Sequence, residues 1–214
     1  MKIAVCSIGN PALHVFKASL DVYAKEHELV LSGPGGLPNA GRNFGESYNS
    51  LLLKIFETET ECIVANDDVV LRPDTMKLIL EDVRSLQASG VKLGWVGAQT
   101  DRTGTQQNIS NVKPGDKFPK ATTMIAPFFT WVSREAFMAA PFAPTHYGSD
   151  DVSCYDMVSL GYKLFISRAY VHHVHQASGA PPRQPDHRTV MYRWAWENRP
   201  AFAAARKWPK PETH

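Results

Sequence analysis

The sequence predicts an α/β protein with a mostly parallel central sheet flanked by helices, and three observations support this. Short apolar runs alternate with helix-periodic segments through the first hundred residues, as parallel strands joined by crossover helices do. Turn residues and polar side chains follow the ends of these runs, as at Gly9 and Asp68. The second half is a more mixed succession of strands and helices. The 214 residues show no compositional break, so we expect one domain around one sizeable core.

The first half is expected to contain three strands and three helices in alternation. Apolar side chains recur at helical spacing in each expected helix, and β-branched and other apolar residues dominate each expected strand. The elements are a strand over 2–7, a helix over 11–26, a strand over 29–31, a helix over 44–56, a strand over 62–65 and a helix over 75–86.

The second half begins with a strand over 94–98 and ends with a strand over 163–174. An apolar run over 122–132 and helices from Arg134 and Asp151 lie between them. The polar segment 100–120 is too long for a simple connector, which is typical of a lid or a partner-binding loop. Basic and aromatic residues interleave in the tail, a pattern that fits a phosphate backbone, stacked sugars or simple packing of a terminal helix.

Composition limits the class and location of the protein. The 23 Lys plus Arg nearly balance the 21 Asp plus Glu, so bulk charge neither requires nor excludes nucleic acid. Cys6, Cys62 and Cys154 are far apart and odd in number, which favours buried free thiols in a reducing compartment. No run reaches the length of a transmembrane helix and no signal peptide is evident. We therefore expect a cytoplasmic protein, of a cell or of a phage-infected host.

An acidic pair directly follows the third expected strand, in the sequence Asn66-Asp67-Asp68. A carboxylate pair on the tip of a buried strand is costly unless a cation meets it there. The alternative is that the pair makes a turn or caps the next helix. We favour a site for a divalent metal and a phosphorylated ligand, because the pair lies on the rim where ligands of parallel sheets gather.

A second acidic pair, Asp150-Asp151, opens a helix after Tyr147 and Gly148. Ser149 or Asp150 is expected to cap that helix, which leaves one carboxylate over. A free carboxylate opposite a leaving group is placed to accept a proton from an attacking hydroxyl.

Three histidines lie within four residues, in the sequence His172-His173-Val174-His175. On an extended strand His173 and His175 share one face and His172 points to the other. Single strand histidines are mostly structural, but neutral imidazole can also complete the shell of Mn²⁺ or a similar ion.

Together these stretches resemble the family 2 type of glycosyltransferase, which has the GT-A fold. Asn66-Asp67-Asp68 is similar to its DxD motif, and Gly148 to Val152 is similar to its Gly-Glu-Asp turn. Further likenesses are Trp131 to Phe137 with its Arg-Glu-Ala-Phe, Gly161-Tyr162, the late histidines, and Asn39-Ala40-Gly41 followed by Asn43. Two departures are Asn66 in place of the first acid and Asp150 in place of a glutamate.

The resemblance implies a domain organisation for the chain and a separate role for each candidate residue. It implies a GT-A-like domain over 1–178, with a nucleotide-binding half (1–100) and an acceptor half (101–178), and a loop and helical tail over 179–214 packed on it. Asp151, or else Asp150, would be the general base. The metal ion would be Mn²⁺ or Mg²⁺, and its ligands would be Asp68, His173 and His175. The nucleotide-sugar would be bound by Ser7, Gly9, Asn10, Asn39, Arg42, Asn43 and Asp67.

The implied activity is transfer of a hexose from a nucleotide-sugar, a UDP-sugar for preference, to a hydroxyl acceptor with inversion at the sugar carbon. The acceptor would be a glycan or a lipid-linked precursor, or else a hydroxymethylated base in DNA, as in phage DNA modification. A non-catalytic carbohydrate-binding or nucleic-acid-binding derivative of the fold is the alternative. A sugar-nucleotide nucleotidyltransferase is disfavoured, because Ser7 to Pro11 lacks a glycine-rich loop with Arg and Lys. The sequence leaves the oligomeric state open.

Overall fold

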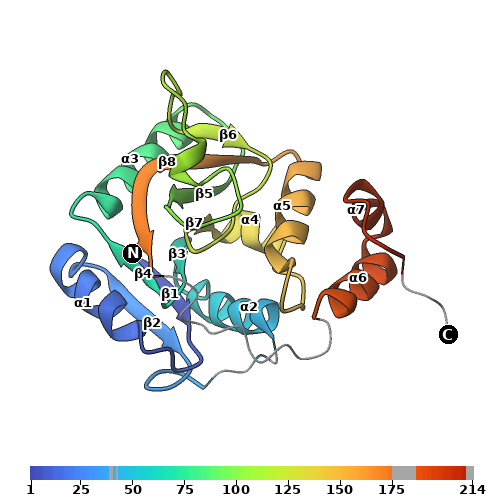
Figure 1. Ribbon diagram of the computed structural model, residues 1–214. Coiled ribbons are helices and arrows are strands. Elements are labelled where there is room, and N and C mark those ends of the chain that lie inside the picture. The colour runs from blue at the N-terminus through green and yellow to red at the C-terminus, as the bar shows by residue number, and fades with distance from the viewer. Residues whose placement is uncertain (39–40, 42, 175–186, 211–214) are drawn as a thin grey trace.

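A computed structural model describes residues 1–38, 41, 43–174 and 187–210. A single mixed sheet lies between two layers of helices (Figure 1), so the predicted α/β class is confirmed. The strands are β1 (Lys2–Cys6), β2 (Glu28–Ser32), β3 (Glu61–Ala65), β4 (Val69–Leu71), β5 (Leu93–Gln99), β6 (Lys120–Thr122), β7 (Phe129–Ser133) and β8 (Lys163–His173).

The strand order across the sheet is β2-β1-β3-β7-β5-β8-β4, and β6 pairs with β8. The first three strands are mutually parallel. β7 is antiparallel to both β3 and β5, and β8 is parallel to β5. β1, β2, β3, β5 and β8 therefore run in one direction, so the sheet is mostly parallel, as expected.

Helices cover both faces of the sheet. The helices are α1 (Leu13–Tyr23), α2 (Phe44–Ile55), α3 (Thr75–Ala88), α4 (Arg134–Ala139), α5 (Ser149–Ser159), α6 (His187–Asn198) and α7 (Pro200–Ala205). α1 and α3 pack their apolar stripes, including Phe16 and Ile79, against one face. α2, α4 and α5 pack against the other face through residues such as Leu52, Phe137 and Met157. The free Cys6, Cys62 and Cys154 that the sequence predicts are confirmed.

The short edge strand β4 was not predicted. It has only three residues and follows β3 after the Asn66-Asp67-Asp68 turn, so its apolar pattern is too short to distinguish from a loop. β4 pairs antiparallel with the end of β8, with Val69 opposite His173. The backbone N–H of Val174 donates to the carbonyl of Asp68 at 2.8 Å. This pairing brings the first acidic turn beside the late histidines.

The polar segment 100–120 is anchored in its first part by one buried amide side chain. Gln107 is fully buried, and its Nε2 donates to the carbonyls of Ala98 (2.9 Å) and Ala126 (3.2 Å). Its Oε1 accepts from the N–H of Ala126 at 2.7 Å. Gln107 therefore ties the loop to the end of β5 and to the chain before β7.

The C-terminal helices α6 and α7 lie on the outer side of α5 (Figure 1). Phe202 and Ala203 are buried there with Val152 of α5, and the ring of Tyr155 packs at a tilt against Phe202 with centroids 5.1 Å apart. The tail tryptophans Trp194, Trp196 and Trp208 pack against this cluster. Much of the aromatic surface of the tail is therefore used to pack its helices against α5, which is the third of the alternatives given above.

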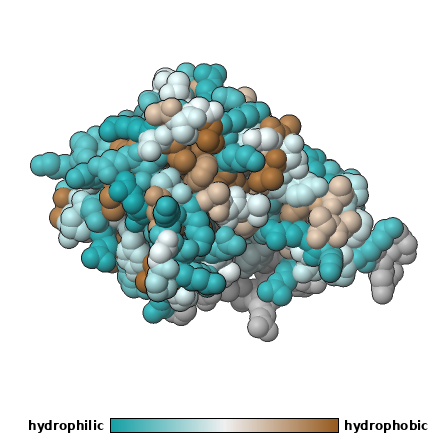
Figure 2. All heavy atoms as spheres, turned by 90° about the horizontal axis from the view of Figure 1, so that it is seen from above, coloured by the Kyte–Doolittle hydropathy of each residue, from teal (hydrophilic) through white to brown (hydrophobic). Residues whose placement is uncertain are grey.

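The face of the protein in Figure 2 is largely hydrophilic, with a small group of hydrophobic residues near its centre. Within the described parts of the chain, every helix is too short or too polar to span a bilayer.

Candidate active site

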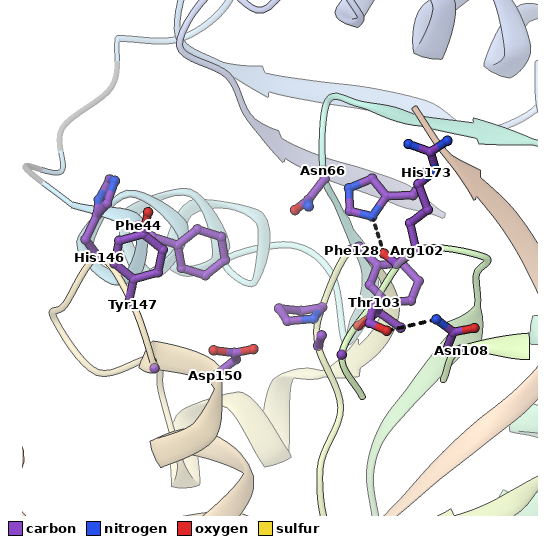
Figure 3. Close-up of a pocket in the computed structure, with 14 residues that line it drawn as sticks. Phe44, Asn66, Arg102, Thr103, Asn108, Phe128, His146, Tyr147, Asp150 and His173 are labelled. Carbon is purple, nitrogen blue, oxygen red and sulfur yellow. Dashed lines mark hydrogen bonds between the residues drawn. The ribbon is translucent and has the colours of Figure 1, made fainter. Parts of the chain in front are cut away.

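A cavity of about 680 Å³ opens between the loop that contains Arg102 and Asn108 and the entrance of α5. Figure 3 shows Asp150 on one side of it and His173, Asn66 and Phe128 on the other. The cavity thus joins the two acidic stretches and the histidine segment that the sequence singles out. Its lining consists of Phe44, Asn66, Arg102, Thr103, Gly104, Asn108, Ala126, Pro127, Phe128, His146, Tyr147, Gly148, Asp150 and His173.

His173 lines this cavity and contacts Asp68, which is buried beside it and is not part of the lining. His173 Nε2 lies 3.0 Å from Asp68 Oδ1, and Asp68 is 2% exposed. The imidazole stacks on the ring of Phe128, with centroids 5.8 Å apart. The β4–β8 pairing described above fixes both residues, so the arrangement depends on the sheet rather than on a flexible loop.

Both ring nitrogens of His173 face oxygen acceptors. Nδ1 lies 3.1 Å from the carbonyl oxygen of Arg102, and Nε2 faces Asp68. A neutral imidazole has one N–H, so one of these contacts would set two lone pairs against each other. Burial acts to lower the pKa of His173, but the hydrogen bond and charge of Asp68, with the Arg102 carbonyl, raise it above its usual value. Both contacts are favourable when the imidazole carries two protons, and a metal ion bound at Nε2 would remove the same conflict.

The donor set fits a divalent metal. With Nδ1–H donating to the Arg102 carbonyl, the Nε2 lone pair is directed at the same side as Asp68 Oδ1. Among the described residues no group of three or more His, Cys, Asp or Glu side chains is gathered for a metal, so Asp68 and His173 are two potential ligands, 3.0 Å apart. His175 lies outside the described residues.

Asp67, at the end of β3, belongs to a buried network with the end of β1. Ser7 Oγ donates to Asp67 Oδ2 at 2.5 Å, and Asn10 Nδ2 donates to Oδ1 at 3.3 Å. Burial raises the pKa of Asp67, whereas the Ser7 hydrogen bond opposes that change. Gly9, with φ of +90°, turns the chain so that its N–H donates to Ser7 Oγ at 3.1 Å. Ser7, Asn10 and Asp67 are thus brought together as predicted, but none of them lines the cavity of Figure 3.

The second acidic pair is divided between two environments. Asp150 is half-buried and lines the cavity, whereas Asp151 forms an ion pair with Arg206, just beyond α7. Burial, followed by the charge of Asp151, raises the pKa of Asp150 to about 7. A carboxylate with this pKa, facing a cavity, can accept and release a proton near neutral pH.

The expectation that Ser149 or Asp150 caps the helix is wrong. α5 starts one or two residues earlier than the sequence suggests, with Gly148 as its N-cap at φ of +66° and no side-chain cap. Both residues therefore lie inside the first turn. Ser149 Oγ instead donates to the carbonyl of Ala143 at 2.6 Å.

The remaining candidates have other positions. Asn43 caps α2, because its side-chain oxygen accepts from the N–H of Glu46 at 3.0 Å. Asn39 and Arg42 lie outside the described residues.

Sequence reasoning missed both side walls of the cavity. One wall is formed by Arg102, Thr103 and Asn108, and Asn108 Nδ2 donates to the carbonyl of Thr103 at 2.9 Å (Figure 3). The other wall contains Phe44 and the pair His146-Tyr147, which directly precedes the acidic pair. The only signal in the sequence was the unusual length of the 100–120 segment.

A parallel strand set that ends in an acidic turn, followed by a mixed half that closes a cavity over it, is a GT-A-like glycosyltransferase fold. Among solved structures the chain is similar to TarS of S. aureus. It matches TarS 1-349 with a TM-score of 0.58 and 10% identity over 82% of this chain and 60% of that one. TarS 1-349 in complex with UDP-GlcNAc gives 0.54 and 10%, over 80% and 57%. A197 from STIV gives 0.50 and 14%, over 77% and 80%.

At these identities the likeness establishes the fold. The chain spans less than two thirds of the length of the TarS structures named here. No protein-family model matches the sequence, and a search of curated proteins finds no match.

Proposed function

We propose that this protein is a metal-dependent, inverting glycosyltransferase that uses a UDP-sugar. The observation that carries the proposal is the placement of Asp150 and His173 on opposite sides of one cavity, with Asp68 Oδ1 3.0 Å from His173 Nε2. His173, one member of this pair, faces Asp150 across a space in which a sugar fits. The GT-A-like fold and the UDP-GlcNAc bound by TarS support the choice of donor.

Asp68 and His173 would hold Mn²⁺ or Mg²⁺. When bound, such an ion supplies positive charge to the diphosphate of the donor and so favours its departure. Asp67 directly precedes Asp68, and Ser7 and Asn10 follow the neighbouring strand β1 on the same rim of the sheet. We assign them to the nucleoside end of the donor, where Asp67 is held rigidly by its two hydrogen bonds.

Asp150 is the proposed general base. It accepts the proton of the acceptor hydroxyl while that oxygen forms a bond to the sugar carbon and the bond from this carbon to the diphosphate breaks. A single base on the face opposite the leaving group gives inversion. Asp150 is preferred over Asp151 as the base, because Asp151 forms an ion pair with Arg206 and is not part of the cavity lining.

The residues of the cavity walls support a saccharide as the acceptor. Phe44 and Tyr147 offer ring faces, and Arg102, Thr103 and Asn108 offer donors and acceptors, a combination that suits a saccharide. A glycan or lipid-linked precursor in the cytoplasm is therefore placed ahead of a hydroxymethylated base in DNA.

Hydrolysis of UDP-sugars tests the proposal. The wild-type protein with Mn²⁺ is expected to release UDP, and Asp150→Asn and Asp68→Asn are each expected to reduce the rate at least 100-fold. Asp74→Asn, at the exposed start of α3, is the control. UDP binding that requires Mn²⁺ but yields no turnover with any sugar or acceptor would favour the non-catalytic derivative. Absence of binding by every nucleoside diphosphate would overturn both.

A further inference from the structure

The C-terminal tail reaches the second acidic pair through one side chain. Arg206 Nη2 pairs with Asp151 Oδ1 in the first turn of α5, and the same nitrogen lies 3.7 Å from the sulfur of Met124. The guanidinium also lies over the ring of Phe202, 5.7 Å from its centroid. Because Phe202 is buried, Arg206 is held in position by the packing of the tail.

We propose that Arg206 is a positioning residue for the base, and that the C-terminal helices are thereby part of the catalytic apparatus. Arg206 binds Asp151 away from the cavity and balances its charge, which leaves Asp150 as the carboxylate that faces the acceptor. This inference rests on the proposed function, since it concerns the same acidic pair.

The electrostatic argument begins with two adjacent carboxylates in one half-buried turn. Ionising both is unfavourable unless a cation balances one of them. Burial and the charge of Asp151 raise the pKa of Asp150, and the charge of Arg206 opposes this. Among the described residues, the other charged or titratable groups near Asp150 are Cys154 on α5, His146 and Tyr147 on the preceding loop, and Arg102 and His173 across the cavity.

Two substitutions should therefore move the pKa of Asp150 in opposite directions. Arg206→Ala leaves the charge of Asp151 unbalanced, so the pKa of Asp150 rises. Asp151→Asn removes the neighbouring negative charge and releases Arg206, so the pKa of Asp150 falls. A role of Arg206 confined to docking the tail predicts neither shift.

The chain offers a matched control for docking. Arg199, at the start of α7, makes a similar bridge to α5, with Nε 3.0 and 3.3 Å from the two oxygens of Asp156. This bridge joins the same two parts of the protein without touching Asp150 or Asp151. Arg199→Ala should therefore weaken docking without moving the pKa of Asp150.

The test is the pH dependence of Mn²⁺-dependent UDP-GlcNAc hydrolysis. Wild-type activity should rise with pH through about 7, and Arg206→Ala should shift this limb upward by roughly half to one pH unit. Asp151→Asn should shift it downward, Arg206→Lys should restore most of the wild-type profile, and Arg199→Ala should leave it in place. An unmoved limb in Arg206→Ala, or an equal movement in Arg199→Ala, overturns the inference.

A second measurement separates this inference from the proposed function. Carbon-13 NMR titration of the aspartate carboxyls, with the Asp150 signal assigned from its absence in Asp150→Asn, reports the pKa without turnover. If the protein hydrolyses no UDP-sugar, the proposed function fails, and the same shifts in the NMR titration still support or refute the coupling of Arg206 to Asp150.

Discussion

His173 Nε2 lies 3.0 Å from Asp68 Oδ1, although 105 residues separate the two in sequence. The antiparallel pairing of β4 with β8 places them together. Because the other imidazole nitrogen faces the Arg102 carbonyl, Nε2 meets Asp68 either as a second N–H or as a lone pair that would bind a metal ion. The second arrangement connects the sheet topology to the proposed metal dependence.

Metal binding should therefore depend on this pair and not on the neighbouring histidine. Asp68→Asn and His173→Ala are each expected to weaken Mn²⁺ binding in the presence of UDP at least tenfold, because each removes one of two protein ligands. Isothermal titration with MnCl₂ measures the affinity.

His172→Ala is the matched control for this prediction. His172 is adjacent on the same strand, but its Nδ1 pairs with Asp101 at 3.0 Å on the other side. Its replacement should leave the affinity for Mn²⁺ within about twofold. Equal losses in His172→Ala and His173→Ala would contradict the assignment.

Asp150 should make the folded protein less stable as pH rises. Its pKa in the folded state is about 7, above the ordinary 3.8, so the folded state holds this proton more tightly than the unfolded state. Stability is unaffected below about pH 4 and is lost progressively as pH rises to about 7. Asp150→Asn removes this cost, so at pH 8 we expect a free energy of unfolding higher by about 1–3 kcal/mol.

Urea unfolding at pH 5 and pH 8 measures this effect. The advantage of Asp150→Asn over wild type should grow between the two pH values, while that of Asp74→Asn should not. An advantage of the same size at both pH values would show that Asp150 is not the group with the raised pKa.

The sequence predicted the strand ends of the first half, because apolar runs there are bounded by turns and acids. Asp67 lies with Ser7 and Asn10 because the parallel strands β1 and β3 end side by side on one rim. The meeting of Asp68 with His173 was expected only through resemblance. It depends on β4, whose three residues carry no periodicity that a sequence can show.

The cavity walls could not be predicted for a different reason. The loop that carries Arg102 and Asn108 is placed by Gln107, whose amide bonds to backbone groups on two separate segments. A glutamine in a polar run looks solvent-exposed in a sequence, and only its partners reveal that it is buried. Similarly, nothing in the acidic pair itself indicates that Arg206, 55 residues later, binds one member.

Ser7 should matter for nucleotide binding beyond its contribution to stability. Its Oγ lies 2.5 Å from Asp67 Oδ2 and is buried, so Ser7→Ala should cost about 1–3 kcal/mol in the free energy of unfolding. It also frees the Asp67 carboxylate to move, so we expect the affinity for UDP to fall at least fivefold, as measured by calorimetry.

Ser19→Ala controls for the stability loss in that experiment. Ser19 is also buried, and its Oγ donates to Phe16 and accepts from the N–H of Leu71, but it lies away from the strand ends. It should destabilise the protein by a similar amount and leave UDP affinity unchanged. If both variants bind UDP as wild type does, Asp67 and Ser7 are not part of the nucleotide site.

Gly148 joins the cavity to the tail, and its replacement should affect both. It has φ of +66°, and a Cβ there would overlap the sulfur of Met191 on α6. Gly161 also has positive φ, +84°, but a Cβ there would meet nothing within 4 Å. Gly161→Ala should therefore cost about 1–2 kcal/mol from backbone strain alone, and Gly148→Ala roughly 1–3 kcal/mol more from the clash.

Thermal unfolding of Gly148→Ala, Gly161→Ala and the double variant Gly148→Ala/Met191→Ala separates the two contributions. Met191→Ala, measured alone as well, should return part of the extra loss in the double variant, because it removes the atom that the new methyl group meets. The same double variant should recover part of the activity that Gly148→Ala loses, since Gly148 sets the path of the chain between Tyr147 and Asp150. Equal losses in the two glycine variants, without recovery, would mean that α6 does not lie against the cavity loop.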